Sequence, residues 1–332
     1  MTHARDDLRT GKPEATMLDA IRRTLEDCMA ADDSIVVLGE EAASGGLFGA
    51  TRGLLDRFGK DRVLEPRTDD QTLLGTALGM AMSGLRPVIE LELADRVLAT
   101  LETLGAEIAR LRYTSGAEET APLILRLPVS CGTGAGPDAS LSPEALLAHL
   151  PGLVVVAPSS AEDASGFLRA ALAGDDPVVI LEPARLYRAA RGPVASDATA
   201  FGKLRVLRSG EDATVFSWGG AIASASAAAK NLAAEDIDVT VVDVRSLAPL
   251  DEDGIVEEAR RTGRVVIAHD APRCGGFGAE IAATIAERAV LHLEAPILRV
   301  TGVDSPAPRT HEATWLPGAE RIRRAVEQVV DF

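Results

Sequence analysis

The stretch Ile35-Val36-Val37-Leu38 is a short, continuous run of apolar residues. A run of this kind, without polar alternation, is typical of a strand in a parallel sheet that is covered on both faces. Similar runs recur through the first 190 residues, at Val88–Leu91, Leu123–Leu127, Val154–Ala157 and Val178–Leu181. Because helical patterns lie between these runs, the sequence predicts an α/β domain with a mostly parallel sheet.

The segments between the predicted strands carry helix signals. Thr16 followed by Asp19 resembles a capping box. Ser142-Pro143-Glu144 offers Ser as an N-cap and Pro at the first helical position. A helix is also expected from about Ala161 to Ala173. The stretch Leu73–Met82 is rich in Gly and Ala, which permits close approach of a neighbour at a cost in helix propensity.

A second α/β unit is expected after residue 200. Its predicted strands are Thr214–Trp218, Val239–Val242, Val265–Ile267 and Leu298–Val300, and its predicted helices are Ala221–Ala234, Glu280–Ala289 and Glu320–Val329. Residues 191–200 are small and polar without apolar periodicity, which is typical of a linker. The sequence therefore predicts two three-layer α/β/α domains, at residues 1–190 and 201–332.

Composition excludes several kinds of partner. The chain has 332 residues and a formal net charge of −16, which argues against nucleic acid and against an anionic membrane surface. Three widely spaced cysteines without a Cys-x-x-Cys pair fit a reducing cytoplasm. Met1–Pro13 has no apolar core of a secretory signal, and no apolar run is long enough to span a membrane. We therefore expect a cytoplasmic protein.

Several motifs stand in a fixed order over most of the chain. They include Leu38-Gly39-Glu40-Glu41, Arg52-Gly53-Leu54, Gly84-Leu85-Arg86-Pro87, Leu181–Arg188, Asp243–Asp251, Gly275–Glu280 and Arg299-Val300-Thr301-Gly302. Together these motifs resemble the β subunit of the thiamine diphosphate-dependent first component of 2-oxo acid dehydrogenase complexes. The resemblance runs from about Thr16 to the C-terminus.

The resemblance implies a partner and a cofactor. The chain has no Gly-Asp-Gly motif followed by Asn for a Mg²⁺-diphosphate group, so the family pattern implies an α subunit that supplies this half of the site. The expected assembly is an α2β2 heterotetramer with thiamine diphosphate and Mg²⁺ between the two kinds of chain. The cofactor would carry the difficult chemistry, and the protein would supply position and proton transfer.

The family's ring-binding Glu falls at Asp70 in this chain, with Thr68 beside it in the implied cofactor site. Asp keeps the acid but shortens its reach by about 1.5 Å, the length of one carbon–carbon bond. A displacement on that scale can cost on the order of 100-fold in rate. Asp69 and Asp70 are alternatively solvated loop acids or an N-cap before Leu73.

The family's stacking aromatic falls at Arg96, and Glu92 replaces a residue that is usually uncharged. Arg can stack on a flat ring, but its charge would oppose a protonated pyrimidine. Alternatively, Arg96 pairs with Glu92 four residues earlier or with another carboxylate. A third interpretation is recognition of an anionic substrate, since Arg forks suit carboxylate and phosphate.

The family's active-site His falls at Ala139, so this chain lacks the residue that the resemblance implies for transfer to a lipoyl arm. Glu40 keeps the family's acid and is expected either in a proton path or as a helix cap. The loop from Ala171 to Asp176 resembles one that holds K⁺, mainly by main-chain oxygens.

Three functions follow from the resemblance. The first is decarboxylation of a pyruvate-like 2-oxo acid with transfer of the acyl unit to an aldehyde or ketone, a carboligase-type reaction in which Asp70 and Glu40 are the catalytic acids. The second is the ordinary role in a dehydrogenase complex, with a lipoyl acyltransferase as a further partner. The third is a scaffold of the same fold that has lost or replaced its thiamine cofactor.

Overall fold

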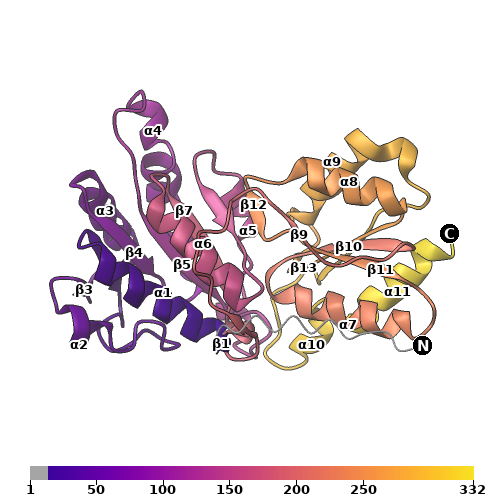
Figure 1. Ribbon diagram of the computed structural model, residues 1–332, viewed down its shortest axis with the longest axis horizontal. Coiled ribbons are helices and arrows are strands. Elements are labelled where there is room, and N and C mark those ends of the chain that lie inside the picture. The colour runs from indigo at the N-terminus through magenta and orange to yellow at the C-terminus, as the bar shows by residue number, and fades with distance from the viewer. Residues whose placement is uncertain (1–13) are drawn as a thin grey trace.

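A computed structural model describes residues 14–332, so the prediction for Met1–Pro13 lies outside the described residues. The described chain forms two large sheets that lie side by side, each with helices on both faces, and a separate two-stranded sheet (Figure 1). The predicted α/β architecture with two helix-covered sheets is thereby confirmed.

The first sheet has seven strands in the order β12-β6-β7-β5-β4-β2-β3, and only β12 runs antiparallel to its neighbour. Its strands are β2 (Ile35–Gly39), β3 (Val63–Leu64), β4 (Arg86–Glu90), β5 (Ile124–Val129), β6 (Val154–Val156), β7 (Val178–Pro183) and β12 (Ser246–Ala248). Every residue of β2 is buried, because alternate side chains enter the two cores on either side of the sheet.

Helices cover the two faces of this sheet. On one face, α1 (Met17–Ala31) packs against α6 (Ala161–Ala173). The other face carries α3 (Asp70–Met82) with η1 (Ala94–Thr100) and η2 (Thr103–Ile108). The shorter elements are α2 (Leu54–Phe58), α4 (Leu111–Thr114), η3 (Pro137–Ala139), α5 (Glu144–Ala148) and η4 (Ala184–Leu186).

The second sheet has five strands in the order β14-β13-β10-β11-β9, and only β9 is antiparallel. Its strands are β9 (Arg205–Arg208), β10 (Ala213–Ser217), β11 (Val239–Asp243), β13 (Val265–Pro272) and β14 (Leu298–Gly302). Its helices are η5 (Gly219–Ala221), α7 (Ile222–Ala233), α8 (Glu252–Thr262), α9 (Gly278–Ala289), η6 (Val290–His292), α10 (Glu312–Trp315) and α11 (Ala319–Val330). One face packs on α7 and α11, the other on α8 and α9.

The two halves are joined through β12, which lies after residue 200 but pairs with β6 at the edge of the first sheet (Figure 1). Part of the predicted linker is also structured: β8 (Arg191–Pro193) pairs antiparallel with β1 (Glu14–Thr16). Sequence patterns did not reveal these pairings because the strands are only three residues long. The division at residues 190 and 200 stays a prediction.

The residues at the N-termini of the helices can be compared with the predicted N-caps. Thr16 accepts a hydrogen bond from the Asp19 backbone, as predicted. Asp69 caps α3 by accepting from the backbone of Thr72, which confirms the N-cap interpretation for this acid. The expected Ser142 cap is wrong: Pro143 holds the cap position of α5 without a side-chain hydrogen bond, because its backbone already turns there (φ −88°, ψ 16°).

Candidate functional site

Four of the site residues predicted from the sequence come together at one edge of the first sheet. Glu40 directly follows β2, and Glu92 follows β4, the parallel neighbour of β2. Asp70 opens α3, and Arg96 lies in η1. Because the carboxyl ends of neighbouring parallel strands meet at the same edge, the fold places these side chains together.

Arg96 binds all three acids. Its Nε and Nη2 donate to the two carboxylate oxygens of Asp70 at 2.8 and 2.7 Å. Its Nη1 donates to Glu40 at 2.5 Å and to Glu92 at 2.9 Å. The predicted pairing of Arg96 with Glu92 or with another carboxylate is confirmed, and we call Glu40, Asp70, Glu92 and Arg96 the Arg96 cluster.

The three carboxyl groups and the one guanidinium group of the Arg96 cluster are partly shielded from solvent. The exposed fraction of the side chain is 12% for Asp70, 29% for Arg96 and 57% for Glu40. Burial, followed by the charge of Glu40, raises the pKa of Glu92 above its ordinary value. Hydrogen bonding to Asp70 raises the pKa of Arg96, so this residue stays charged. One of the acids can therefore carry a proton more readily than an isolated carboxyl group.

The other two positions of the predicted cofactor site lie beside this edge. Thr68 is exposed on the bend before α3. Ala139 is buried in η3, and the backbone of the nearby Leu141 donates to both oxygens of Asp95 at 3.2 and 3.1 Å. Because Asp95 precedes Arg96 in η1, this contact ties the loop that carries Ala139 to the cluster.

The loop with Ala139 is held by an acid that sequence reasoning missed. Glu312 accepts hydrogen bonds from the backbones of Gly132 and Gly134 at 2.8 and 2.6 Å, and from the hydroxyl of Ser140 at 3.3 Å. A run of backbone N–H groups in a turn is a ready anion site. Here the anion is the protein's own side chain. The loop consists mainly of glycine and alanine, which do not indicate a partner about 180 positions later in the chain. No local signal in the sequence therefore identified Glu312.

Two oxygen acceptors of the loop predicted to hold K⁺ accept hydrogen bonds from arginines. Arg112 donates to the carboxylate of Asp176 at 2.7 Å, and Arg86 donates to the carbonyl of Gly174 at 2.6 Å. The carbonyl of Ala171 accepts from the backbone of Gly174 at 3.3 Å. In the part of the chain that the structure describes, no group of three His, Cys, Asp or Glu side chains could hold a metal. The potassium site stays a prediction.

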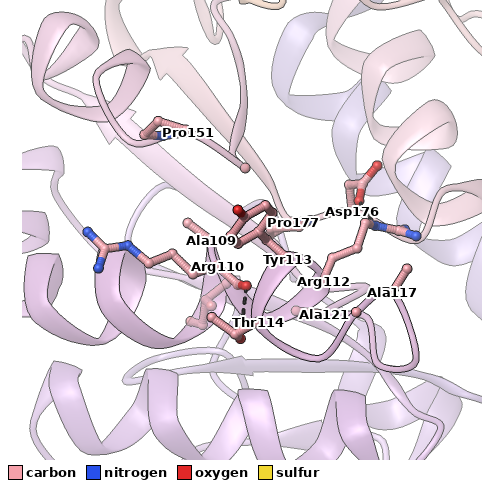
Figure 2. Close-up of a pocket in the computed structure, with 13 residues that line it drawn as sticks. Ala109, Arg110, Arg112, Tyr113, Thr114, Ala117, Ala121, Pro151, Asp176 and Pro177 are labelled. Carbon is pink, nitrogen blue, oxygen red and sulfur yellow. Dashed lines mark hydrogen bonds and ion pairs between the residues drawn. The ribbon is translucent and has the colours of Figure 1, made fainter.

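A cavity of about 1050 Å³ lies beside this loop (Figure 2). It is lined mainly by apolar surface from the region of η2 and α4 and from Pro151 and Pro177. Figure 2 shows Arg112 and Asp176 at one end, while the side chain of Arg110 extends in the opposite direction.

A buried histidine of β13 serves in packing. His269 is buried and stacks on Trp218, with 5.0 Å between ring centroids. Burial lowers its pKa to about 4, so the ring is neutral. The neighbouring Asp270 forms a two-fold contact with Arg185 at 2.9 and 2.7 Å. These residues hold the two halves together and lie apart from the Arg96 cluster.

Comparison with known families matches both halves of the chain. The transketolase pyrimidine-binding domain matches residues 13–190, and the transketolase C-terminal domain matches residues 202–322. A solved structure described as the inactive β4 tetramer of a split-gene transketolase has a TM-score of 0.77 at 24% identity. It covers 95% of this chain and 98% of its own, which shows the shared fold. No helix among residues 14–332 is long and apolar enough to cross a bilayer.

Curated relatives align over nearly the whole chain. The 3-methyl-2-oxobutanoate dehydrogenase subunit beta of Mycobacterium tuberculosis is 40% identical, over 95% of this chain and 92% of its own. The 2-oxoisovalerate dehydrogenase subunit beta of Pseudomonas aeruginosa is 37% identical, with 95% of each chain covered. The Pyruvate dehydrogenase E1 component subunit beta of Bacillus subtilis is 35% identical, over 96% of this chain and 99% of its own.

Proposed function

Because the chain belongs to the family of β subunits of 2-oxo acid dehydrogenase first components, we propose that it works in a heteromeric thiamine diphosphate-dependent enzyme. The enzyme would decarboxylate a pyruvate-like 2-oxo acid and pass the acyl unit to an acceptor. The observation that carries this proposal is the Arg96 cluster, which gathers acids where the family pattern expects contact with the cofactor ring.

The Arg96 cluster suits an aminopyrimidine ring, which offers hydrogen-bond donors to a carboxyl group. Glu40 and Glu92 each use one carboxylate oxygen on Arg96, which leaves their second oxygens for another donor. All three nitrogens of Arg96 are bound at the edge of the guanidinium plane, and a flat face of this group would stack on the ring. Three carboxyl groups outweigh the single positive charge, so a protonated ring is tolerated.

The chain's own residues then have distinct roles. Thiamine diphosphate, when bound, supplies the carbanion chemistry. Asp70 and Arg96 form a fixed pair that orients the ring, and Glu92 holds or accepts a proton beside it because its pKa is raised. Glu40, the most exposed acid of the cluster, connects the site with solvent. Thr68 would contact the cofactor at the mouth of the site.

The acceptor proposed here is a small aldehyde or ketone rather than a lipoyl arm. Ala139 contributes no imidazole to the site, and a methyl side chain takes up less volume than the His that the family pattern has at this position. A carboligase-type transfer needs space for a second small substrate more than it needs a group that serves the lipoyl arm. Transfer to the lipoyl domain of an acyltransferase is the alternative that the names of the relatives support.

The proposed assembly is α2β2, in which an α subunit supplies Mg²⁺ and the diphosphate half of the site. A K⁺ ion at Ala171–Asp176 would have to displace Arg86 from the carbonyl of Gly174. We also propose a reducing, cytoplasmic location, which three cysteines without a disulfide in the described chain support.

The test is product analysis with the chain purified together with its α partner. The complex is given pyruvate with either acetaldehyde or a lipoyl domain, and the products are quantified by mass spectrometry. We expect a hydroxyketone from the aldehyde and little acyl-lipoyl product. An Ala139→His variant is the matched control, and its acylation of the lipoyl domain should rise. Rapid acylation by the unaltered complex would instead identify the ordinary dehydrogenase role.

A further inference from the structure

A second, positively charged cavity lies on the opposite face of the first sheet from the Arg96 cluster, at the start of α1. Its volume is about 370 Å³. Four arginines from separate segments line it: Arg22 of α1, Arg52 of the loop before α2, and Arg188 and Arg191 at either side of the entry to β8. We call it the arginine trough. A concentration of positive charge is notable on a chain whose formal net charge is −16.

Most of this charge is not neutralised by the protein. The side chains of Arg52, Arg188 and Arg191 form no hydrogen bond or ion pair with any residue in the range 14–332. The single acid in the lining, Asp19, is already bound by Arg22 at 2.8 Å and by the hydroxyl of Thr16 at 2.8 Å. Three guanidinium groups therefore remain free to bind an anion.

Backbone geometry fixes where these arginines stand. Arg191 lies directly opposite Thr16 in the β1–β8 pair, which sets it at the first turn of α1. Gly49 lies beside Arg52: a Cβ there would be 3.5 Å from its Nη2, and the positive φ of 98° favours glycine. The 15-residue helix α1 points its N-terminus toward the same place, and its dipole adds to the positive potential.

Leu18 and Phe48 contribute an apolar part of the remaining wall. Phe48 lines the trough and packs on the buried Tyr187, with 5.3 Å between ring centroids. Arg forks bind phosphate oxygens in pairs, and three free forks around one small cavity match the several oxygens and the double charge of a phosphoryl group. The ring of Phe48 offers a flat apolar surface in the same cavity as the arginines, which suits the sugar or base that carries such a group.

We infer that the arginine trough binds a small phosphate-bearing metabolite, at a site separate from the proposed cofactor site. The inference does not depend on the proposed function, because none of the trough residues belongs to the Arg96 cluster. The phosphoryl group could belong to a sugar phosphate or to a nucleotide, and both present the same chemistry to the three free arginines.

The test is calorimetric titration of inorganic pyrophosphate into the full-length chain, purified without an α partner so that no second diphosphate site is present. Saturable binding of one pyrophosphate per chain is expected, and it should weaken with rising salt because the arginines are exposed. Inorganic phosphate, glucose 6-phosphate and adenosine monophosphate are titrated next, and tighter binding of either organic phosphate than of inorganic phosphate identifies the source of the group.

Two variants assign the binding to the trough. Arg52→Gln and Arg191→Gln should each weaken pyrophosphate binding by about tenfold or more, since each removes a charged hydrogen bond. Arg110→Gln is the matched control, because Arg110 is also exposed and unpaired among the described residues but lies at the other cavity. Unchanged melting temperatures establish that all three variants fold. Absence of saturable binding, or equal affinities for Arg52→Gln and Arg110→Gln, would overturn the inference.

Discussion

Replacing Arg96 with Gln removes the only positive charge from the Arg96 cluster. The guanidinium group makes four hydrogen bonds to three carboxylates, two of them to Asp70. An exposed ion pair contributes about 0–1 kcal/mol, and loss of one partner of a buried pair costs about 3–5 kcal/mol. With side-chain exposures of 12% for Asp70 and 29% for Arg96, we expect Arg96→Gln to lower the free energy of unfolding by about 2–3 kcal/mol.

The loss should depend on pH in a definite direction. Burial already raises the pKa of Glu92, and without Arg96 this pKa rises further. An acid whose pKa is raised in the folded state contributes stability at low pH, and this contribution is lost as the pH rises through the folded pKa. The difference between the two proteins should therefore be smaller at pH 5 than at pH 8.

Urea unfolding of the purified chain, followed by circular dichroism, measures both quantities. Arg324→Gln is the control, because Arg324 has 72% of its side chain exposed and, within residues 14–332, pairs only with Glu320; its loss should stay below about 0.5 kcal/mol. The double variant with Asp70→Asn should lose less than the sum of the single variants. Equal small losses for Arg96→Gln and Arg324→Gln, or a loss that shrinks toward pH 8, would refute the reasoning.

Three further predictions concern groups away from the cluster. Arg126 is fully buried and bonded to Glu90 and Glu182, so Arg126→Met should cost about 3–5 kcal/mol in urea unfolding by leaving two acids without their cation. Burial raises the pKa of Glu144 to about 7, so about 3 kcal/mol of stability is lost as the pH rises from about 4 to about 8, and Glu144→Gln should flatten this slope. Glu312→Gln keeps only one acceptor for the loop it anchors, and hydrogen exchange at residues 132–140 should accelerate roughly tenfold or more.

Much of the architecture follows from short-range patterns. The apolar run Ile35–Leu38 does form a buried strand with a core on each face, because such a run has no side to present to water. The helix Ala161–Ala173 has the predicted bounds. The helix α8 was missed: its sequence, Glu252–Thr262, is mostly polar and acidic, and its buried stripe is narrow.

The site was only partly predictable. The pair Glu92 and Arg96 could be expected from their spacing of four residues. The two-fold contact of Arg96 with Asp70 bridges 26 positions and depends on how α3 meets η1, which local pattern does not specify. Glu312 reaches its loop from the other half of the chain, so only the tertiary structure reveals it.

Calorimetric titration of thiamine diphosphate with Mg²⁺ into the chain co-purified with its α partner tests the central claim most directly. The account predicts saturable binding near one cofactor per αβ pair, weakened in Arg96→Gln because the ring loses its stacking and orienting partner. An intact, folded complex that binds no cofactor would contradict the account and make this chain a scaffold whose Arg96 cluster serves another chemistry.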